Sequence, residues 1–261
     1  MTVEAATGRV PTRETSGYLG RFRGRMDLFI TPVFFLLLAF AVGVVWIYVD
    51  FDQQTASILE PAKLLRETGQ HLSMTFWSTL IVVLVAIPLG ILLTRPRFRN
   101  LTGPVLAVAN AGQAVPAYGL LILFLAWLGP GLQTAVFALI VYAILPILRN
   151  TMVGLEQVDQ FVIEAGRGMG LSKFQALIRI ELPLAVPVIL AGVRIALVIN
   201  VGTAALAYLI GAGGLGVSIG AGLKLQRDTA TFVAGALVAM LALTVDFAAA
   251  SIERYLRPKG L

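Results

Sequence analysis

The sequence predicts an all-α membrane protein with about six transmembrane helices, and three observations lead to that fold class. Only 13% of the 261 residues are charged and 58% are hydrophobic, whereas an ordinary soluble domain carries about 25% charged residues. The mean hydropathy is +0.87, and one soluble core of this size cannot hide that much apolar surface. Several uncharged stretches also reach the roughly 20 apolar residues that a membrane helix needs. The composition argues against a cytosolic enzyme.

The boundaries of the expected spans follow from the charges and from one turn signal. The uncharged stretch 100–148 is cut by Gly129-Pro130-Gly131, a typical turn sequence. The first apolar run is longer than that of a signal peptide and has no small-residue cleavage site after it, so we expect a retained helix. The six expected spans lie near residues 28–49, 72–94, 101–128, 132–148, 184–210 and 229–252, with tails at 1–27 and 253–261.

Lys and Arg residues gather in alternate segments and predict the orientation. The amino tail, the 95–100 loop, the 149–183 segment and the carboxyl tail carry most of them. The opposite loops carry only Lys63, Arg66, Lys224 and Arg227. Because basic residues mark cytoplasmic loops, both termini are expected in the cytoplasm. The net charge of +6 then indicates membrane anchors rather than nucleic acid binding.

The 149–183 segment is too strongly patterned for a simple connection. Asp159 is placed to cap a first short helix, which Gly168 and Gly170 end. Ser172 and Gln175 have the spacing of a capping box, which starts a second helix. We therefore expect two short helices around a glycine turn.

The second short helix carries an apolar stripe. Phe174, Leu177 and Ile178 share one face, and Pro183 is expected to end the helix. Two interpretations follow. The helix lies on the lipid surface, or its stripe enters a groove on a cytoplasmic partner.

Three fixed pieces of this segment resemble the EAA loop of bacterial ABC importer permeases. They are Glu164-Ala165-Gly166, then Gly170, then Ile180-Glu181-Leu182-Pro183. All spacings of the family pattern are kept, and the one departure is Gly166, where the family usually has alanine. Glycine weakens a helix by about 1 kcal/mol relative to alanine. The resemblance implies a coupling helix that docks on an ATP-hydrolysing subunit through Glu164, Ala165, Gly166, Gly170, Phe174, Leu177, Ile178, Ile180, Leu182 and Pro183.

The resemblance covers about residues 68–252 and implies the type I ABC importer permease fold. Gln113-Ala114-Val115-Pro116-Ala117-Tyr118-Gly119 and the glycine-rich stretch 211–216 are similar to the osmoprotectant branch, which takes up glycine betaine, choline, carnitine and related compounds. Permeases for methionine, sulfonates or amino acids are the first alternative, and an ATPase-independent secondary transporter is the second.

The resemblance also implies partners. These are two ATP-hydrolysing subunits, a second permease of the same or a different kind, an extracytoplasmic binding protein and the lipid bilayer of the bacterial inner membrane. The chain itself is expected to carry no cofactor, metal site or catalytic residue, and to bind no nucleic acid. No Walker A sequence occurs in the chain, so ATP hydrolysis is expected on a separate subunit.

The glycine-rich stretch 211–216 also fits the G-x-G-x-x-G pattern. A dinucleotide site needs a preceding strand, and here a membrane helix precedes the glycines. We therefore expect Gly211, Gly213, Gly214 and Gly216 to form a flexible loop or gate at the outer end of the path.

Two charges lie inside expected spans, Arg194 and Asp246. Such charges are costly in a bilayer and usually face protein or water. Because the fifth and sixth spans run antiparallel, the two charges could form an ion pair that locks these helices. Alternatively, Arg194 reaches the headgroups and Asp246 faces a water-filled path.

Other polar residues within the spans are candidates for the translocation path. Aromatic rings attract quaternary ammonium groups, which favours the two tyrosines among them. Each candidate has the alternative of bonding a neighbouring helix, and His71 is expected to be an interfacial polar residue. The path candidates are Asn110, Gln113, Tyr118, Asn200, Thr203 and Tyr208.

Overall fold

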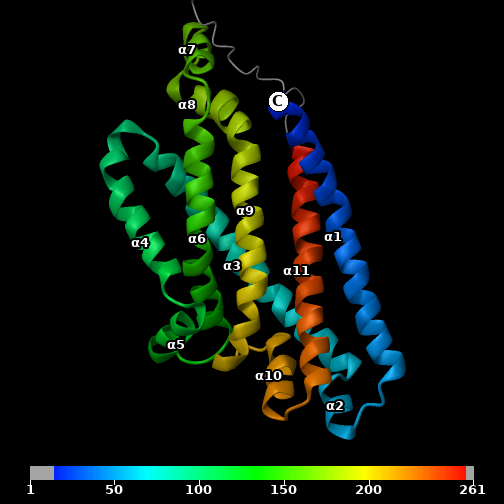
Figure 1. Cartoon of the computed structure of the whole chain (residues 1–261). Helices are drawn as coiled ribbons and strands as arrows, with labels where there is room; N and C mark the ends of the chain where they lie inside the picture. The colour runs from blue at the N-terminus through cyan, green and yellow to red at the C-terminus, as the bar shows by residue number, and fades with distance from the viewer. Residues whose placement is uncertain (1–14, 257–261) are drawn as a thin grey trace, which may run out of the picture.

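The computed structural model describes residues 15–256, with side chains from residue 31 onward, and all regular structure in this range is helical (Figure 1). The expected tails fall partly outside it, at 1–14 and 257–261. The longer helices are α1 (Thr15–Tyr48), α3 (Pro61–Leu93), α6 (Leu132–Glu156), α9 (Leu182–Ala204) and α11 (Asp228–Leu256). The shorter ones are α2 (Gln53–Ile58), η1 (Pro96–Leu101), α4 (Thr102–Ala114), α5 (Ala117–Leu128), α7 (Gln160–Gly168), α8 (Lys173–Ala176), η2 (Leu177–Glu181), η3 (Ala205–Ile210) and α10 (Gly216–Lys224).

Five segments of the described chain are long and apolar enough to cross a membrane. They lie in α1, α3, α6, the α8–η3 stretch and α11. A sixth crossing depends on α4 and α5, which are bent relative to each other by 101°. The bend falls at Val115, which has extended backbone angles, and at Pro116, which disfavours helical geometry in the residue before it. The segment 101–128, expected as one span, therefore contains two helices of different direction.

Several helices are longer than the expected spans, among them α3 and α6. The helix α3 begins at Pro61 rather than near residue 72, because proline fits the first turn of a helix and the polar residues after it continue the same helix. The helix α6 continues to Glu156 rather than ending near 148. The connection between α6 and α9 is therefore shorter than the expected segment 149–183, because residues 149–156 belong to α6.

Pro183 does not end the second short helix, contrary to the sequence expectation. The chain passes from α8 through one π-helical turn, η2, directly into α9. Pro183 lies just after this π-helical turn, and such a turn interrupts the regular α-helical hydrogen bonds that proline cannot form. The second short helix is thus continuous with the fifth span.

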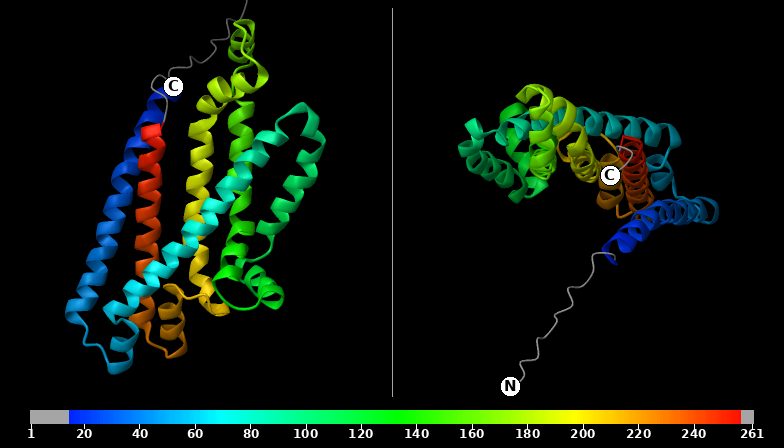
Figure 2. Two further views of the ribbon diagram at one scale, coloured as in Figure 1. Left: turned by 180° about the vertical axis from the view of Figure 1, so that it is seen from behind. Right: turned by 90° about the horizontal axis from the view of Figure 1, so that it is seen from above.

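The helix α6 lies at the centre of the bundle and packs against α3, α9, α4 and α5. The helix α11 lies between α9 and α1, and α1 forms one edge (Figure 2). Leu148, Ile147 and Val82 are fully buried where α6 meets α3. Many large apolar side chains of α1 remain exposed, as expected for a surface that faces lipid.

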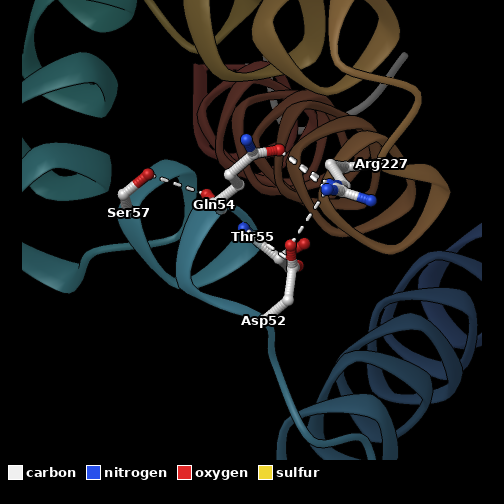
Figure 3. A network of polar contacts seen from close by, with 5 residues as sticks. All are labelled: Asp52, Gln54, Thr55, Ser57 and Arg227. Carbon is white, nitrogen blue, oxygen red and sulfur yellow. Dashed lines mark hydrogen bonds and ion pairs between the residues drawn. The ribbon is translucent and has the colours of Figure 1, made fainter.

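The two ends of the bundle differ. The helices α7 and α8 lie at the end that also holds the start of α1 and the end of α11, while α2, α5 and α10 lie at the opposite end (Figure 1). At that opposite end, α2 is joined to the turn before α11 (Figure 3). Asp52 caps α2 and contacts Arg227 at 3.2 Å, and Gln54 Oε1 accepts two hydrogen bonds from the same guanidinium.

Candidate coupling and translocation site

Short-range hydrogen bonds fix both helices of the 157–181 loop. The Asp159 carboxylate accepts a hydrogen bond from Phe161 N at 2.8 Å and caps α7. Gly170, with φ of +94°, makes the turn between the helices. Ser172 and Gln175 then form a complete capping box. The two short helices and their caps are as the sequence predicts.

The residues expected to couple to an ATPase fall into two groups. Gly166 is buried and packs against Ile180, whose Cδ1 would collide with a Cβ at position 166. Ile180 Cδ1 is the end of a flexible side chain, so alanine at position 166 requires only that this side chain moves. Leu177, Ile180 and Leu182 are half-buried, while Glu164, Ala165, Gly170, Phe174, Ile178 and Pro183 are exposed.

The exposed group makes the surface of the helix pair partly apolar. The Phe174 side chain is 69% exposed, and Phe161 and Met169 are still more so. Exposed large apolar side chains that gather on one loop are typical of an interaction surface. Figure 1 shows that α7 projects beyond the ends of α1 and α11.

A groove of about 980 Å³ separates the helix pair from the end of α3. Its walls include Arg99, Arg167 and Lys173. Arg95 Nη2 crosses to Glu181 Oε2 at 2.6 Å, and the Glu181 side chain is only 8% exposed. The sequence analysis did not identify this ion pair, because 86 positions separate its members.

Arg194 and Asp246 lie in contact within the bundle. Arg194 Nε is 2.5 Å from Asp246 Oδ1, and Nη2 is 2.7 Å from Oδ2. The two charged groups are therefore in contact, as the ion-pair hypothesis requires. The alternative, in which Arg194 reaches the headgroups and Asp246 faces a water-filled path, does not match this contact. That the pair locks the helices stays a prediction.

Three of the path candidates bond neighbouring backbone or side chains. Asn200 is fully buried, and its Nδ2 donates to Ser78 Oγ and Thr79 Oγ1, each at 3.0 Å. Gln113 Nε2 donates to the carbonyl of Tyr142, and Asn110 Oδ1 accepts from Arg149. For Asn200, the structure matches the alternative interpretation, in which the side chain forms hydrogen bonds with a neighbouring helix. Thr203 and Tyr208 are half-buried, and Tyr118 is exposed.

The 211–216 loop makes close contacts with its neighbours, and its flexibility stays a prediction. Gly211, Gly213 and Gly214 have φ values of +75°, +84° and +83°. Gly214 N donates to Gln70 Oε1 at 3.0 Å. A Cβ at Gly216 would collide with the carbonyl oxygen of Ala205. Glycine is needed here for backbone angles and close packing, and a gating role stays a prediction.

His71 is fully buried rather than interfacial, which is a further correction. Its Nε2 lies 2.8 Å from the carbonyl oxygen of Val201. One helical turn earlier, buried Glu67 contacts Ser218 Oγ at 2.7 Å. The spacing of Glu67 and His71 at i and i+4 is a signal that the sequence analysis did not use.

The bundle of apolar helices, with a capped and partly apolar helix pair at one end, is the structure of a membrane transport permease that is driven by a partner. The family model of the binding-protein-dependent transport system inner membrane component matches residues 86–259. The chain belongs to this family, and the resemblance stated above is confirmed. It is a non-catalytic translocation subunit of an ABC importer in the inner membrane, and ATP hydrolysis resides on a separate subunit.

Several curated relatives are more than 40% identical. The carnitine transport permease protein OpuCB of Listeria monocytogenes is 42% identical over 76% of this chain and 90% of its own. The glycine betaine/carnitine/choline transport system permease protein OpuCD of Bacillus subtilis is 41% identical over 74% and 84%. The osmoprotectant import permease protein OsmY of Salmonella typhimurium is 43% identical over 72% and 80%.

The fold also matches solved importers. An inward-facing structure of the MetNI methionine ABC transporter superimposes with a TM-score of 0.67, at 29% identity over 76% of this chain and 99% of the other. A structure of an amino acid ABC transporter gives a TM-score of 0.66 at 18% identity, over 79% and 100%, and shows the shared fold. The fold implies an ATPase and a substrate-binding protein as partners.

Proposed function

We propose that the solute carried by this permease is an osmoprotectant, a quaternary ammonium compound such as glycine betaine, carnitine or choline. The observation that carries the proposal is the identity of 41–43% to relatives that are named for these solutes. Tyr118 supports it, because its ring is exposed and aromatic faces attract quaternary ammonium groups. The binding protein supplies most of the selectivity, so a closed cation cage in this chain is not required.

We further propose that α7 and α8 dock on the ATPase. The supporting observation is the exposed apolar surface of Phe161, Phe174 and Ile178 on a loop whose helices are separately capped. Each such side chain contributes roughly 1.5–3 kcal/mol when a partner buries it. ATP binding then draws two such loops together and tilts the spans.

The proposed assembly has two ATPases, this permease and a second permease of the same or another kind, with the binding protein outside. The end that holds α7 and α8 faces the cytoplasm, and both termini lie there. Basic residues support this orientation, because the α7–α8 end includes Arg97, Arg99, Arg167, Lys173 and Arg179. Accessibility of single introduced cysteines to a membrane-impermeant reagent tests it.

Uptake of radiolabelled glycine betaine, carnitine and choline in a strain that lacks the gene tests the substrate. Restored uptake of one of the three supports the proposal, and its absence together with restored methionine uptake overturns it. Methionine is the second candidate because the MetNI permease shares the fold at 29% identity.

Co-purification and one charge reversal test the docking surface. Glu164→Lys places a positive charge on the exposed face of α7, and we expect loss of both the ATPase and uptake. Glu60→Lys is the matched control, because Glu60 is exposed at the opposite end of the bundle. Unchanged uptake in Glu164→Lys would contradict the docking proposal.

A further inference from the structure

The first half of α3, at residues 67–79, and Arg95 just beyond its end form hydrogen bonds with one other segment of the chain. Within the described residues, Thr102 Oγ1 donates to the carbonyl of Leu93, and the other side-chain hydrogen bonds that join α3 and Arg95 to another element all go to residues 181–218. The contacts are Glu67 with Ser218, Gln70 with Gly214, His71 with Val201, Ser78 and Thr79 with Asn200, and Arg95 with Glu181.

The first and last of these contacts lie far apart along α3. From residue 67 to the end of the helix at residue 93 the rise is about 39 Å. Ser78, His71 and Asn200 are fully buried. Their hydrogen bonds are therefore shielded from exchange with water.

The contact of α3 with α6 is of a different kind. It consists of apolar side chains such as Val82, Ala86 and Ile147. Apolar packing has no preferred direction, whereas hydrogen bonds fix both distance and angle. A shift of α3 relative to α6 breaks no side-chain hydrogen bond described here, and a shift relative to α9 breaks several.

The inner end of this arrangement reaches the coupling loop. Glu181 directly follows Ile180, the residue that packs against Gly166 of α7. Glu181 is buried, and within residues 15–256 its ion-pair partner is Arg95. A continuous series of contacts therefore connects α7, through Ile180 and Glu181, with Arg95 at the end of α3.

We propose that the Arg95–Glu181 pair is a positioning element that joins the coupling loop to α3, so that α3 and residues 181–218 move as one body during transport. The inference rests on the proposed docking of the ATPase at α7 and α8. At the outer end, Glu67 and Gln70 attach the same body to α10 and to the 211–216 loop. Movement that ATP starts at the inner face thus reaches the outer face.

Reconstituted complete transporters carrying Arg95→Gln, Glu181→Gln or the exchange of both charges test this link. We expect the single variants to retain the ATPase and its basal hydrolysis, and to transport about tenfold less solute per ATP, a typical size for coupling between sites. The exchange Arg95→Glu with Glu181→Arg restores the ratio. An unchanged ratio in the single variants, or no recovery in the exchange, overturns the inference.

Failure of the link and failure of the docking proposal give different results. Loss of the ATPase from the single variants alone places the pair in docking and overturns the inference. If the unmodified permease binds no ATPase, the proposed function fails instead.

Distance measurements test the movement without disturbing the ion pair. The chain has no cysteine, so introduced cysteines carry spin labels at chosen positions only. Leu84→Cys on α3 pairs with Ile195→Cys on α9 or with Val153→Cys on α6, and all three side chains are exposed. Between the nucleotide-free and ATP-trapped states, we expect the 84–195 distance to stay constant and the 84–153 distance to change. Equal changes in both distances overturn the inference.

Discussion

Arg194 of α9 and Asp246 of α11 form a bidentate ion pair between two membrane-spanning helices, with N–O distances of 2.5 and 2.7 Å. Their side chains are 29% and 21% exposed. A charge within a span is costly, and two parallel hydrogen bonds from a planar guanidinium to a carboxylate offset this cost. Both charged side chains are therefore needed to offset the cost of placing them within the bundle.

Arg194→Ala and Asp246→Ala are each expected to lower the free energy of unfolding by about 3 kcal/mol, because each removes the bidentate ion pair and retains one of the two charges. Removal of both charges is expected to cost less than the sum of the two single changes. Thermal unfolding of the detergent-solubilised protein, followed by tryptophan fluorescence, measures these differences. Exchange of the two charges is expected to recover part of the loss.

The Asp52–Arg227 pair provides a matched control with the same residue types, at the end of the bundle that holds α2 and α10. Its side chains are 47% and 38% exposed, and an exposed ion pair contributes less than about 1 kcal/mol. Arg227→Ala is therefore expected to change the unfolding midpoint little. An equal effect of Arg194→Ala and Arg227→Ala would show that burial inside the bundle does not strengthen the pair.

The parts of the site that sequence reasoning predicted depend on neighbouring residues. Asp159 caps α7 and Ser172 forms a capping box with Gln175, because such caps involve residues two or three positions apart. The Arg194–Asp246 contact could be proposed from the sequence, because the distance of each residue from the end of its span places both charges at similar depths in antiparallel helices. Periodicity and charge are sufficient for features of this kind.

Features that depend on packing between distant segments could not be predicted. Pro116 marks a break, but the angle between α4 and α5 is set by how both pack on α6. His71 is buried because α9 covers it, 130 positions along the chain. The contact between Gly214 and Gln70 could not be predicted either, because 144 positions separate the two residues.

Gly216→Ala is expected to be strongly destabilising. A Cβ at this position collides with the carbonyl oxygen of Ala205, so the backbone of the outer loop must move. Gly235→Ala is the matched control, because a Cβ at 235 meets nothing within 4 Å and alanine favours the helix by up to about 1 kcal/mol. Unfolding midpoints of the two variants test the difference, and similar midpoints would show that the loop yields easily.

The attachment of α2 is expected to weaken in acid. Hydrogen bonds from Thr55, with a smaller contribution from the charge of Arg227, hold the pKa of Asp52 below its usual range. A lowered folded-state pKa means that the carboxylate stabilises α2 above the unfolded-state pKa of about 4, and that this contribution is lost as the pH falls through the folded value. Asp52→Asn is expected to remove this part of the pH dependence. Proteolysis of the 49–60 loop between pH 3 and pH 6, with a protease active in acid, checks it, and an unaltered profile in Asp52→Asn would contradict the assignment.

Phe174→Ala separates binding from folding. The Phe174 side chain is 69% exposed, so its removal leaves the packing of the bundle intact and the unfolding midpoint unchanged. If the ATPase buries this ring, the loss of roughly 2 kcal/mol of apolar contact lowers the affinity for the ATPase by more than tenfold. Leu223→Ala is the matched control, since Leu223 is similarly exposed on α10 at the opposite end of the bundle. Binding of the purified ATPase to permease in nanodiscs measures both variants, and an equal decrease for Leu223→Ala would mean that the contact is not specific to the coupling loop.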